Sequence, residues 1–511
     1  MMAADSLLVI SSTLCALFTG VTCLFFWNKP RPQRWLNLLG SLAHLFFSGL
    51  LLANVLESGP QVLRLGGWAA PYGIVYVADL FGAILLGVTG LLASVVALYN
   101  FSGGIDEKRE RFAYHALAQF LVFGVSAAFV TGDIFNLYVC FEILLMSSFG
   151  LLVLGNDRRQ LAGALKYLVL NLVGSVIFLT AVGMLYAQVG TLNFADLARK
   201  LATLEELPVS LHVLSHLLFV AFGIKAGLFP LFFWLPASYH TPPVPVTALF
   251  AGLLTKVGVY SLIRLYTFLF PHSGTGSFEW IWWLSVLTMF VGVVGAVSKN
   301  HIRKILSVHI ISQVGYITLA LALQTPLALA AGIFYMVHNM IAKTGLFLVG
   351  GVVESVSGTD SLKENGGLFK ALPFLSTLFL VLALGLAGLP PLSGFFAKLF
   401  VILAAAEVSS YGSIFFALAV SVFTLFSMLK IWNEAFWKAS PHGPDLALAS
   451  SFARSALTPQ MIAVTCLALL VLAMGLWSAE LFDVSFRAAE GLIDPRAYVD
   501  AVLGPVSGGQ L

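Results

Sequence analysis

The chain has 511 residues, of which 59% are hydrophobic and only 10% are charged, with a formal net charge of +3. Soluble domains carry about 25% charged residues, so a soluble protein of this composition would expose large apolar patches to water. The composition therefore indicates a protein that is dissolved in lipid. The small net charge and the lack of a Lys/Arg-rich tract give no reason to expect nucleic-acid binding.

The sequence carries no recognisable motif for a cofactor or a metal. Its four cysteines lie inside apolar runs and no two of them have C-x-x-C spacing. A disulfide framework, a zinc site or an iron–sulfur cluster is therefore not expected. A phosphate-binding G-x-x-x-x-G-K-[ST] loop, a G-x-G-x-x-G turn and an H-E-x-x-H pair are also missing, so we expect neither ATP hydrolysis nor electron transfer by this chain.

Apolar runs of about 20 residues, the length of a membrane-spanning helix, recur along the whole chain. They fall near residues 6–27, 35–55, 75–98, 112–130, 134–154, 163–187, 212–239, 245–270, 280–298, 304–323, 327–352, 372–406, 411–436 and 460–480. The first run has no basic segment before it and is long enough to span, so we expect a retained helix and not a signal peptide. The seventh and twelfth runs are overlong and contain prolines, which predicts broken helices. The sequence thus predicts an all-α integral membrane protein with about fourteen transmembrane helices.

The basic residues in the connections test this count. If the N-terminus lies outside, the inner connections hold 15 Lys and Arg residues, and the outer connections with the C-terminal tail hold 5. An excess of Lys and Arg marks the cytoplasmic side. A wrong number of spans would scramble this alternation, so the skew favours fourteen spans with both termini on the outer side.

Six lysines within the predicted helices form three pairs at similar spacing. Lys166 and Lys343 are 177 residues apart, Lys225 and Lys398 are 173 apart, and Lys256 and Lys430 are 174 apart. The members of each pair lie five helices apart, which is an odd number, so the second copy enters the membrane from the opposite face. This pattern predicts two inverted five-helix repeats, helices 4–8 and helices 9–13. The one arginine within a helix, Arg264, is expected to extend towards a helix end.

The predicted organisation has four parts. Residues 1–100 hold helices 1–3, residues 112–270 the first repeat, residues 280–437 the second repeat, and residues 438–511 a loop, helix 14 and a C-terminal tail. The broken helices 7 and 12 take matching places in the two repeats. In transporters, such a pair of interrupted helices points to the transport site.

The two broken helices carry lysines, Lys225 before the prolines of helix 7 and Lys398 after those of helix 12. A charge at the bilayer centre costs about 2.5–3.5 kcal/mol on insertion scales, so these residues are not incidental. Prolines free backbone carbonyls, which at this depth must be satisfied by protein or water. We expect both lysines to exchange protons through water; the alternative is that each only caps the broken backbone.

Two residues of helices 5 and 8 are further candidates for proton transfer. Glu142, near the middle of helix 5, is expected to pair with Lys225, either as a partner in proton transfer or as a static ion pair. Lys256, on helix 8, would bridge the two halves, unless its side chain extends to the head groups.

His309, His338 and Lys343 lie between the two broken helices in chain order. Histidine titrates near neutral pH and can relay protons through either ring nitrogen, although a lone buried histidine is often a packing residue. Five accessory candidates complete the set: Lys166, Lys430, Glu434, Asp133 and His240. Of these, Asp133 is also expected to cap a helix N-terminus, and His240 to lie in a turn.

Four segments resemble a known family: GDIFNLYVCFEILLMSS, LFPLFFWLPASYHTPPVPVTALFAGLLTKVGVY, KILSVHIISQVGY and LPPLSGFFAKLF. They are similar to the proton-translocating antiporter-like subunits, which include the large membrane subunits of respiratory complex I. Within this family the chain most resembles the D-type subunits of Mrp-type multisubunit Na+/H+ antiporters. The resemblance covers nearly the whole chain, which lacks the long C-terminal extension of the largest members, such as the A-type Mrp subunits.

This resemblance implies a set of functional residues and partners. The family's essential ionisable residues would be Glu142, Lys225, Lys256, His338 and Lys398, with His309 as a further relay position. Asn339 follows His338 where some relatives have a second histidine. The resemblance also implies transport of H+ and Na+, a bacterial inner membrane, and assembly with the A, B, C, E, F and G subunits of the Mrp antiporter complex.

Three functions are compatible with these features. The first is a subunit of a Na+/H+ antiporter, the second a proton-pumping subunit of complex I or of a membrane-bound hydrogenase, and the third a structural scaffold. A scaffold does not explain lysines at repeat-related places inside the membrane. No cluster of carboxylates resembles a dedicated Na+ site, so sodium is free to pass through a partner protein.

Overall fold

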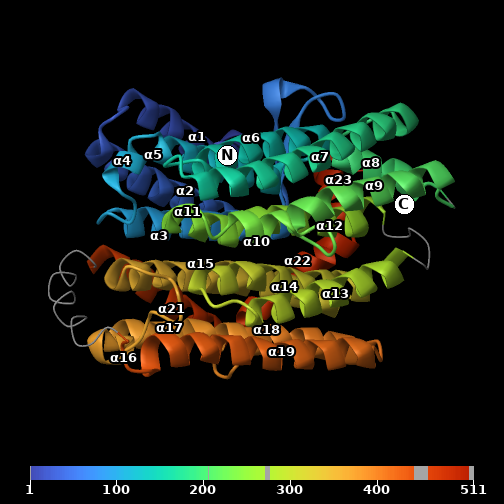
Figure 1. Cartoon of the computed structure of the whole chain (residues 1–511). Helices are drawn as coiled ribbons and strands as arrows, with labels where there is room; N and C mark the ends of the chain where they lie inside the picture. Colours follow the sequence, from blue (N-terminus) through green and yellow to red (C-terminus); the bar gives the residue numbers. More distant parts are fainter. Residues whose placement is uncertain (1, 205, 271–276, 442–457, 506–511) are drawn as a thin grey trace.

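The computed structural model describes residues 2–204, 206–270, 277–441 and 458–505, which form a bundle of long helices (Figure 1). The elements of the first half are α1 (Met2–Phe25), α2 (Pro30–Ser58), β1 (Gln61–Arg64), η1 (Leu65–Gly67), β2 (Val75–Ala78), α3 (Leu80–Asn100), α4 (Glu107–Glu110), α5 (Tyr114–Val130), α6 (Ile134–Leu152), α7 (Arg158–Val189), α8 (Phe194–Ala202), α9 (Val209–Ala226), α10 (Trp234–Ser238), α11 (Val244–Leu249), η2 (Phe250–Leu254), α12 (Thr255–Arg264) and η3 (Leu265–Leu269). Those of the second half are α13 (Ser277–Val297), α14 (Ile302–Leu323), α15 (Pro326–Ser357), α16 (Leu368–Ala371), α17 (Pro373–Ala387), α18 (Ser393–Glu407), α19 (Tyr411–Ile431), η4 (Trp432–Trp437), α21 (Thr458–Leu476), α22 (Ser478–Ile493) and α23 (Arg496–Leu503).

The long helices follow the apolar runs of the sequence. In the described part of the chain, twelve helices are long and apolar enough to cross a membrane, and each coincides with one predicted run. The two remaining runs, 112–130 and 372–406, contain the shorter apolar helices α5 and α17. The prediction of a multi-pass helical membrane protein is thus confirmed, whereas the count of fourteen stays a prediction.

Both overlong runs are broken in the same way. α9 and α17 each end before a glycine with left-handed backbone, Gly227 at φ +78° and Gly388 at φ +94°. The N–H groups of each glycine and of the following residue bond to carbonyls of the last helical turn, a cap that favours glycine. A cis proline follows three residues after each glycine, Pro230 and Pro391. The two halves therefore share one local structure at the break.

The spacing of the lysines predicted that Lys225 and Lys398 take equivalent positions in the two repeats. The position of each lysine relative to its break shows that this prediction was wrong. Lys225 lies on α9, two residues before Gly227, whereas Lys398 lies on α18, ten residues after Gly388. The two lysines are therefore on opposite sides of their breaks. Their similar spacing in the sequence does not describe equivalent positions, although the matching breaks still favour a repeat.

The two halves meet at α14 and α15. α15 packs against α11 and η2, and α14 packs against α12. Near the C-terminus, α21 and α22 return to pack against both α15 and α3, so they join the second half to the first (Figure 1). The middle of the bundle is therefore enclosed by helices from both halves.

The structure adds small elements to the predicted helices. β1 and β2 form an antiparallel pair, with Gln61 opposite Ala78, between α2 and α3. α8 lies between the predicted runs 163–187 and 212–239, and α22 and α23 follow the last span. Most of the predicted connection 438–459, including Arg454, lies outside the described residues.

Candidate proton-transfer site

Six of the basic side chains predicted to transfer protons are buried inside the bundle: Lys225, Lys256, Lys343, Lys398, His309 and His338. Each of these residues exposes 5% of its surface or less. In the described part of the chain, none of the four lysines has a carboxylate within ion-pair distance. Burying several like charges without counter-charges is strongly unfavourable, so the six groups do not all carry a proton at once. A proton path requires such a set of groups, in which fewer protons than binding sites are present and a proton can move from one group to the next.

Lys225 lies at one end of this set, in the last turn of α9. Its Nζ donates a hydrogen bond to Ser175 Oγ on α7 at 3.0 Å and lies 4.8 Å from the centre of the Phe141 ring. Beside it is a cavity of about 10 Å³, lined by Tyr167 and Asn171 among others, which is room for about one water molecule. Lys225 therefore does not cap the broken backbone, because the freed Ile224 carbonyl accepts from the Trp234 indole.

The predicted direct ion pair between Glu142 and Lys225 is not formed. Glu142 lies half-buried on α6, and its Oε1 is buried with no hydrogen-bond partner. The two charges interact electrostatically at longer range, while Ser175 takes the contact with the ammonium group. A carboxylate at this distance still favours a proton on Lys225 and leaves Nζ free to release it.

Lys256 sits directly after a widened turn of the helix. Residues 250–254 form the π-helix η2, and Lys256 Nζ donates to the Ala251 carbonyl at 2.6 Å. π-Turns leave backbone carbonyls less well satisfied and are common at functional sites. Gly252 lets α15 approach, because a Cβ there would lie 2.5 Å from Thr344 Oγ1. The side chain is thus held in the interior and does not extend to the head groups.

Lys343 and His309 lie on the two central helices, α15 and α14. Lys343 Nζ donates to the Leu306 carbonyl at 3.4 Å and interacts electrostatically with Lys256 in the first half. His309 Nε2 bonds Ser427 Oγ at 2.5 Å, and its ring interacts with the charge of Lys343. These two residues therefore continue the row from Lys256 into the second half.

His338 and Lys398 end the row. His338 Nδ1 bonds Ser393 Oγ, the first residue of α18, at 2.7 Å, and its ring interacts electrostatically with both Lys398 and Lys343. Lys398 Nζ donates to the Ala387 carbonyl, freed by the end of α17, at 2.8 Å. Unlike Lys225, Lys398 thus does cap the break, and this contact also holds it towards His338.

Unpaired polar atoms line the middle of the row. The buried atoms without a hydrogen-bond partner include Thr255 Oγ1, His309 Nδ1, Ser312 Oγ, Gln313 Nε2 and both amide atoms of Asn339. Buried polar groups are normally satisfied by protein or by ordered water. Along their helices these residues lie next to, or one turn from, Lys256, His309 and His338, so water bound there would connect the titratable groups.

Two of the six predicted lysines are not part of the row. Lys166 is exposed on the outer face of α7, among exposed apolar side chains. Lys430 is half-buried and donates to the Val297 and Lys299 carbonyls at the end of α13, at 3.0 and 2.7 Å. Their spacing to the buried lysines therefore did not predict burial.

The other accessory residues have local roles. Asp133 caps α6 by accepting from the Asn136 N–H at 2.8 Å, as expected. Glu434 forms a partly exposed ion pair with Lys438 at 2.6 Å. Arg264 is buried and extends to the N-terminal end of α3, where it pairs with the capping residue Asp79 at 2.5 Å.

A polar cavity of about 800 Å³ opens between the halves at one end of the bundle. Its lining includes His240, Arg303, Lys304, Asp157, Glu354 and Asp360. Burial lowers the pKa of His240 to about 4, with Lys304 and Arg303 adding to the effect, so the ring is neutral at pH 7. His240 lies in the expected turn, and a neutral imidazole there can accept a proton.

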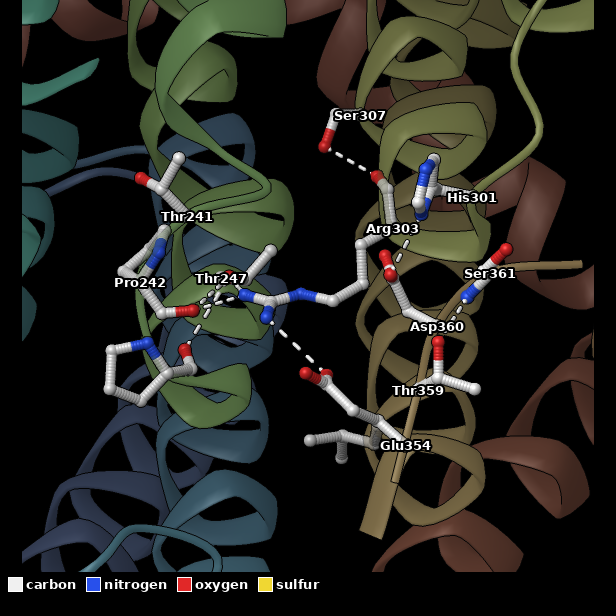
Figure 2. A network of polar contacts seen from close by, with 12 residues as sticks. Thr241, Pro242, Thr247, His301, Arg303, Ser307, Glu354, Thr359, Asp360 and Ser361 are labelled. Atoms are coloured by element: carbon white, nitrogen blue, oxygen red, sulfur yellow. Dashed lines mark hydrogen bonds and ion pairs between the residues drawn. The ribbon is translucent and has the colours of Figure 1, made fainter. Parts of the chain in front are cut away.

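Arg303 connects the two halves at this cavity (Figure 2). From α14 its guanidinium donates to the Pro242 carbonyl and to Thr247 Oγ1 in the first half, the latter at 2.9 Å. It also lies 3.4 Å from Glu354 Oε2 on α15. The sequence predicted Arg303 in a connection, yet only 7% of its surface is exposed. A buried arginine thus fixes the turn between the broken helix and α11.

Several residues of the site were not predicted. Tyr316 lies under Lys398, with its ring centre 5.4 Å from Nζ, and stacks on Tyr335. Tyr335 donates to Gln313 Oε1 at 2.7 Å. Gln313 and Tyr316 belong to the segment HIISQVGY, so its polar residues were a usable signal.

Comparison with known proteins defines the class. The family model described as NADH:quinone oxidoreductase/Mrp antiporter, TM, matches residues 131–426, which hold the whole row. The chain therefore belongs to this family of membrane proteins.

Its similarity to individual proteins is closer still. The D subunit of the Na(+)/H(+) antiporter of Alkalihalophilus pseudofirmus is 41% identical over 97% of this chain and 99% of the relative. Its counterpart in Bacillus subtilis is 39% identical over the same shares. A chain in the structure of the Mrp complex from Dietzia sp. DQ12-45-1b has a TM-score of 0.89 at 31% identity, covering 98% of this chain and 100% of that one. A chain of the archaeal membrane-bound sulfane sulfur reductase has a TM-score of 0.85 at 25% identity, with the same coverage.

Proposed function

We propose that this chain is the D-type subunit of a Mrp-type multisubunit Na+/H+ antiporter and moves protons along its buried row of basic side chains. The row would run from Glu142 and Lys225 through Lys256 and Lys343 to Lys398, with His309 and His338 beside the last two. The observation that carries the proposal is the burial of six basic groups without ion-pair partners among the described residues, next to unpaired polar atoms.

Within the described ranges no lysine of the row forms an ion pair, and Glu142 is the one carboxylate placed in the row, so the number of protons that the row holds can vary. A proton added at one lysine disfavours a proton on the next, because like charges repel strongly at low dielectric. Movement of one proton therefore shifts the others along the row. Such coupling links the two halves through Lys343, which interacts with Lys256 on one side and with His309 on the other.

The large polar cavity is the proposed site of proton uptake. The basic residues Arg303 and Lys304 in its lining lie on the side that the Lys/Arg excess assigns to the cytoplasm. His240 in the cavity wall is neutral at pH 7, so it would pass protons on without retaining them. Both termini would then lie outside a bacterial inner membrane.

Partners are required for sodium transport. The relatives are antiporter subunits, and the proposed partners are the A, B, C, E, F and G subunits of the Mrp complex. Na+ would cross the membrane either at the interface between this chain and a partner subunit or within a partner subunit, because the lysine row repels cations. The ions exchanged would be H+ and Na+.

The proposal is tested with the whole complex in everted membrane vesicles of a host that lacks other Na+/H+ antiporters. Lys225→Ala, Glu142→Ala and Lys398→Ala should each abolish the Na+-dependent collapse of a pH gradient, while the complex still assembles. Lys166→Ala is the matched control, because it removes an intramembrane lysine that is exposed and outside the row. Exchange at the unmodified rate in Lys225→Ala would refute the role of the row.

A proton-pumping component of a redox complex is the second candidate. It is favoured by the likeness to a chain of the sulfane sulfur reductase complex. The same vesicles separate the two functions: the antiporter moves protons when Na+ is added without any electron donor. Proton movement that needs an electron donor would favour the redox complex.

A further inference from the structure

The buried face of α2 is polar, which is unusual for a helix at the edge of a membrane bundle. Its buried residues recur every three or four positions: Gln33, Asn37, Ser41, His44 and Ser48. The opposite face carries exposed apolar side chains, including Trp35, Leu39, Leu42 and Phe46. A helix with apolar residues towards lipid and polar residues inside lines a polar path or a polar contact.

Two of these residues, Asn37 and Ser41, join a continuous chain of hydrogen bonds with Glu110 and with α5. Glu110 Oε1 accepts from His115 Nε2 at 2.7 Å, and His115 Nδ1 accepts from Asn37 Nδ2 at 2.9 Å. Gln119 Nε2 donates to Asn37 Oδ1 at 2.5 Å and to Ser41 Oγ at 2.8 Å. His115 therefore has one ring nitrogen on a carboxylate and the other on a polar side chain deeper in the membrane, the arrangement of a relay.

Glu110 forms the end of these hydrogen bonds that lies nearest the membrane surface. It belongs to the short α4, outside the spans, and pairs with Arg34 at 2.6 Å. Arg34 exposes 16% of its side chain, so the pair is reached from the surface. The Lys/Arg excess assigns this end of the bundle to the cytoplasm.

His44 forms the inner end. It lies fourteen residues into the 29-residue α2, or about 21 Å at 1.5 Å per residue, near the middle of the membrane. Its Nε2 bonds Ser126 Oγ on α5 at 2.8 Å, and its Nδ1 is buried with no partner. A Cβ on Gly90 of α3 would lie 2.6 Å from this Nδ1, so α3 packs closely there.

A small cavity lies between these hydrogen-bonded side chains and α11. About 10 Å³ in volume, it is lined by Asn37, Ser41, Gln119, Tyr114 and, from α11, Leu249. This is room for about one water molecule, and Gln119 Oε1 is buried without a partner beside it. Leu249 precedes the turn whose Ala251 carbonyl binds Lys256.

We propose that the polar face of α2 and its partners on α5 form a second proton path, which leads from Glu110 to His44 outside the lysine row. The path carries protons, directly or through water, into the middle of the bundle, next to the α11–α12 segment that holds Lys256. This proposal rests on the proposed function in one respect: the path would supply protons to the same Na+/H+ exchange. Hydrogen bonds connect Glu110 with Ser41, and His44 lies one helical turn further along α2, so water would complete the path between Ser41 and His44.

Sodium is a poorer match for this path. Its mouth holds the guanidinium of Arg34, and the carboxylate of Glu110 already accepts from Arg34, His115 and Asn100. A hard cation needs several free oxygens, and those of Glu110 are occupied.

Water access is tested first, by thiol labelling in the assembled complex. In a variant whose four native cysteines are replaced by serine, Ser41→Cys is treated with a small water-soluble methanethiosulfonate from either side of the membrane. It should react at least about tenfold faster than Leu42→Cys, which faces lipid one residue away, because thiolates form only in contact with water. The reaction should be faster from the Glu110 side. Equal, slow labelling of the two cysteines would overturn the path.

Proton transfer is tested by exchange. Glu110→Gln and His44→Gln should each lower Na+-dependent exchange about tenfold per assembled complex and shift its pH profile, with the half-maximal Na+ concentration unchanged. His216→Gln, an exposed histidine outside the path, should leave exchange unchanged. Unmodified rates and pH profiles in both variants would overturn the proposal, as would a change in the half-maximal Na+ concentration with an unchanged pH profile. Labelling of Ser41→Cys does not depend on Lys225. The experiments therefore distinguish an error in the proposed role of the lysine row from an error in the proposed second path.

Discussion

Gly388 controls the position of Lys398, and an alanine there tests whether that position matters for exchange. A Cβ at Gly388 would lie 2.8 Å from Lys398 Cδ, closer than such atoms approach. Its backbone, at φ +94°, is left-handed, which costs a residue other than glycine about 1–2 kcal/mol. The lysine side chain must shift to relieve the contact, and we expect this shift to weaken its hydrogen bond to the Ala387 carbonyl.

The size of the effect follows from that displaced hydrogen bond. Lys398 Nζ donates to the Ala387 carbonyl at 2.8 Å, and a hydrogen bond to a charged group contributes about 1.5–3 kcal/mol. The loss changes the balance between the protonated and neutral lysine by about ten- to hundredfold. We therefore expect Gly388→Ala to lower exchange at least tenfold per assembled complex.

Gly227→Ala provides the matched control. Gly227 ends α9 with the same left-handed backbone, at φ +78°, but its added Cβ would meet only Leu235 Cδ1, at 3.3 Å. Both variants thus carry the backbone strain, and only Gly388→Ala displaces a lysine. The measurement is Na+-dependent dissipation of a pH gradient in everted vesicles, normalised to the amount of assembled complex. Equal exchange in the two variants would refute this role of Gly388.

Three further changes test other parts of the account. Lys398→Arg should not support exchange, because arginine keeps its proton; an active variant in the vesicle assay would instead indicate a structural charge. Asp79→Asn should lower the free energy of unfolding by about 3–5 kcal/mol, because it leaves the buried Arg264 unpaired; an unchanged melting temperature of the purified complex would contradict this. Burial raises the pKa of Glu110, but hydrogen bonds from Arg34 and His115 outweigh burial and hold the pKa below its ordinary value. Its contribution to stability is therefore complete at neutral pH and lost as the pH falls through this lowered pKa. The melting temperature of Glu110→Gln should lie below that of the unmodified complex at pH 7, and this difference should disappear only at acidic pH. A difference that does not depend on pH would exclude the ionised pair as its cause.

The spans and their breaks were predictable from the sequence because lipid imposes simple rules. A helix that crosses hydrocarbon must be long and apolar, and prolines interrupt it wherever they occur. The runs around Pro230 and Pro391 accordingly become broken helices. The position of Asp133 before a helix likewise predicted its capping contact.

Which face of a span is buried was harder to predict. Lipid-facing and buried positions are both apolar in a membrane protein, so the hydropathy pattern does not separate them. Lys166 therefore looked like the buried lysines although it lies on the outer face of α7. The similar spacing of the lysine pairs also misled, although the order of Lys225 before Pro230 and of Lys398 after Pro391 in the sequence already placed the two lysines on opposite sides of their breaks.

Contacts between distant segments were out of reach for sequence reasoning. Arg303 looked like an ordinary basic residue of a connection, because its contacts with Pro242 and Thr247 are made by a turn some sixty residues earlier. Ser175 could not be distinguished from other small residues of α7 until the fold placed it against Lys225. The polar positions of α2, by contrast, recur every three or four residues in the sequence, so this helical period was a usable signal.

In the proposed mechanism, protons pass through buried basic side chains that change their protonation during exchange. The most direct measurement is Na+-driven proton movement by the purified complex in liposomes that contain a pH-sensitive dye, with Lys256→Met compared with the unmodified chain. Methionine keeps the length and packing of the side chain but cannot bind a proton. The account predicts that Na+ no longer produces a pH change in the variant; a pH change at the unmodified rate would contradict it.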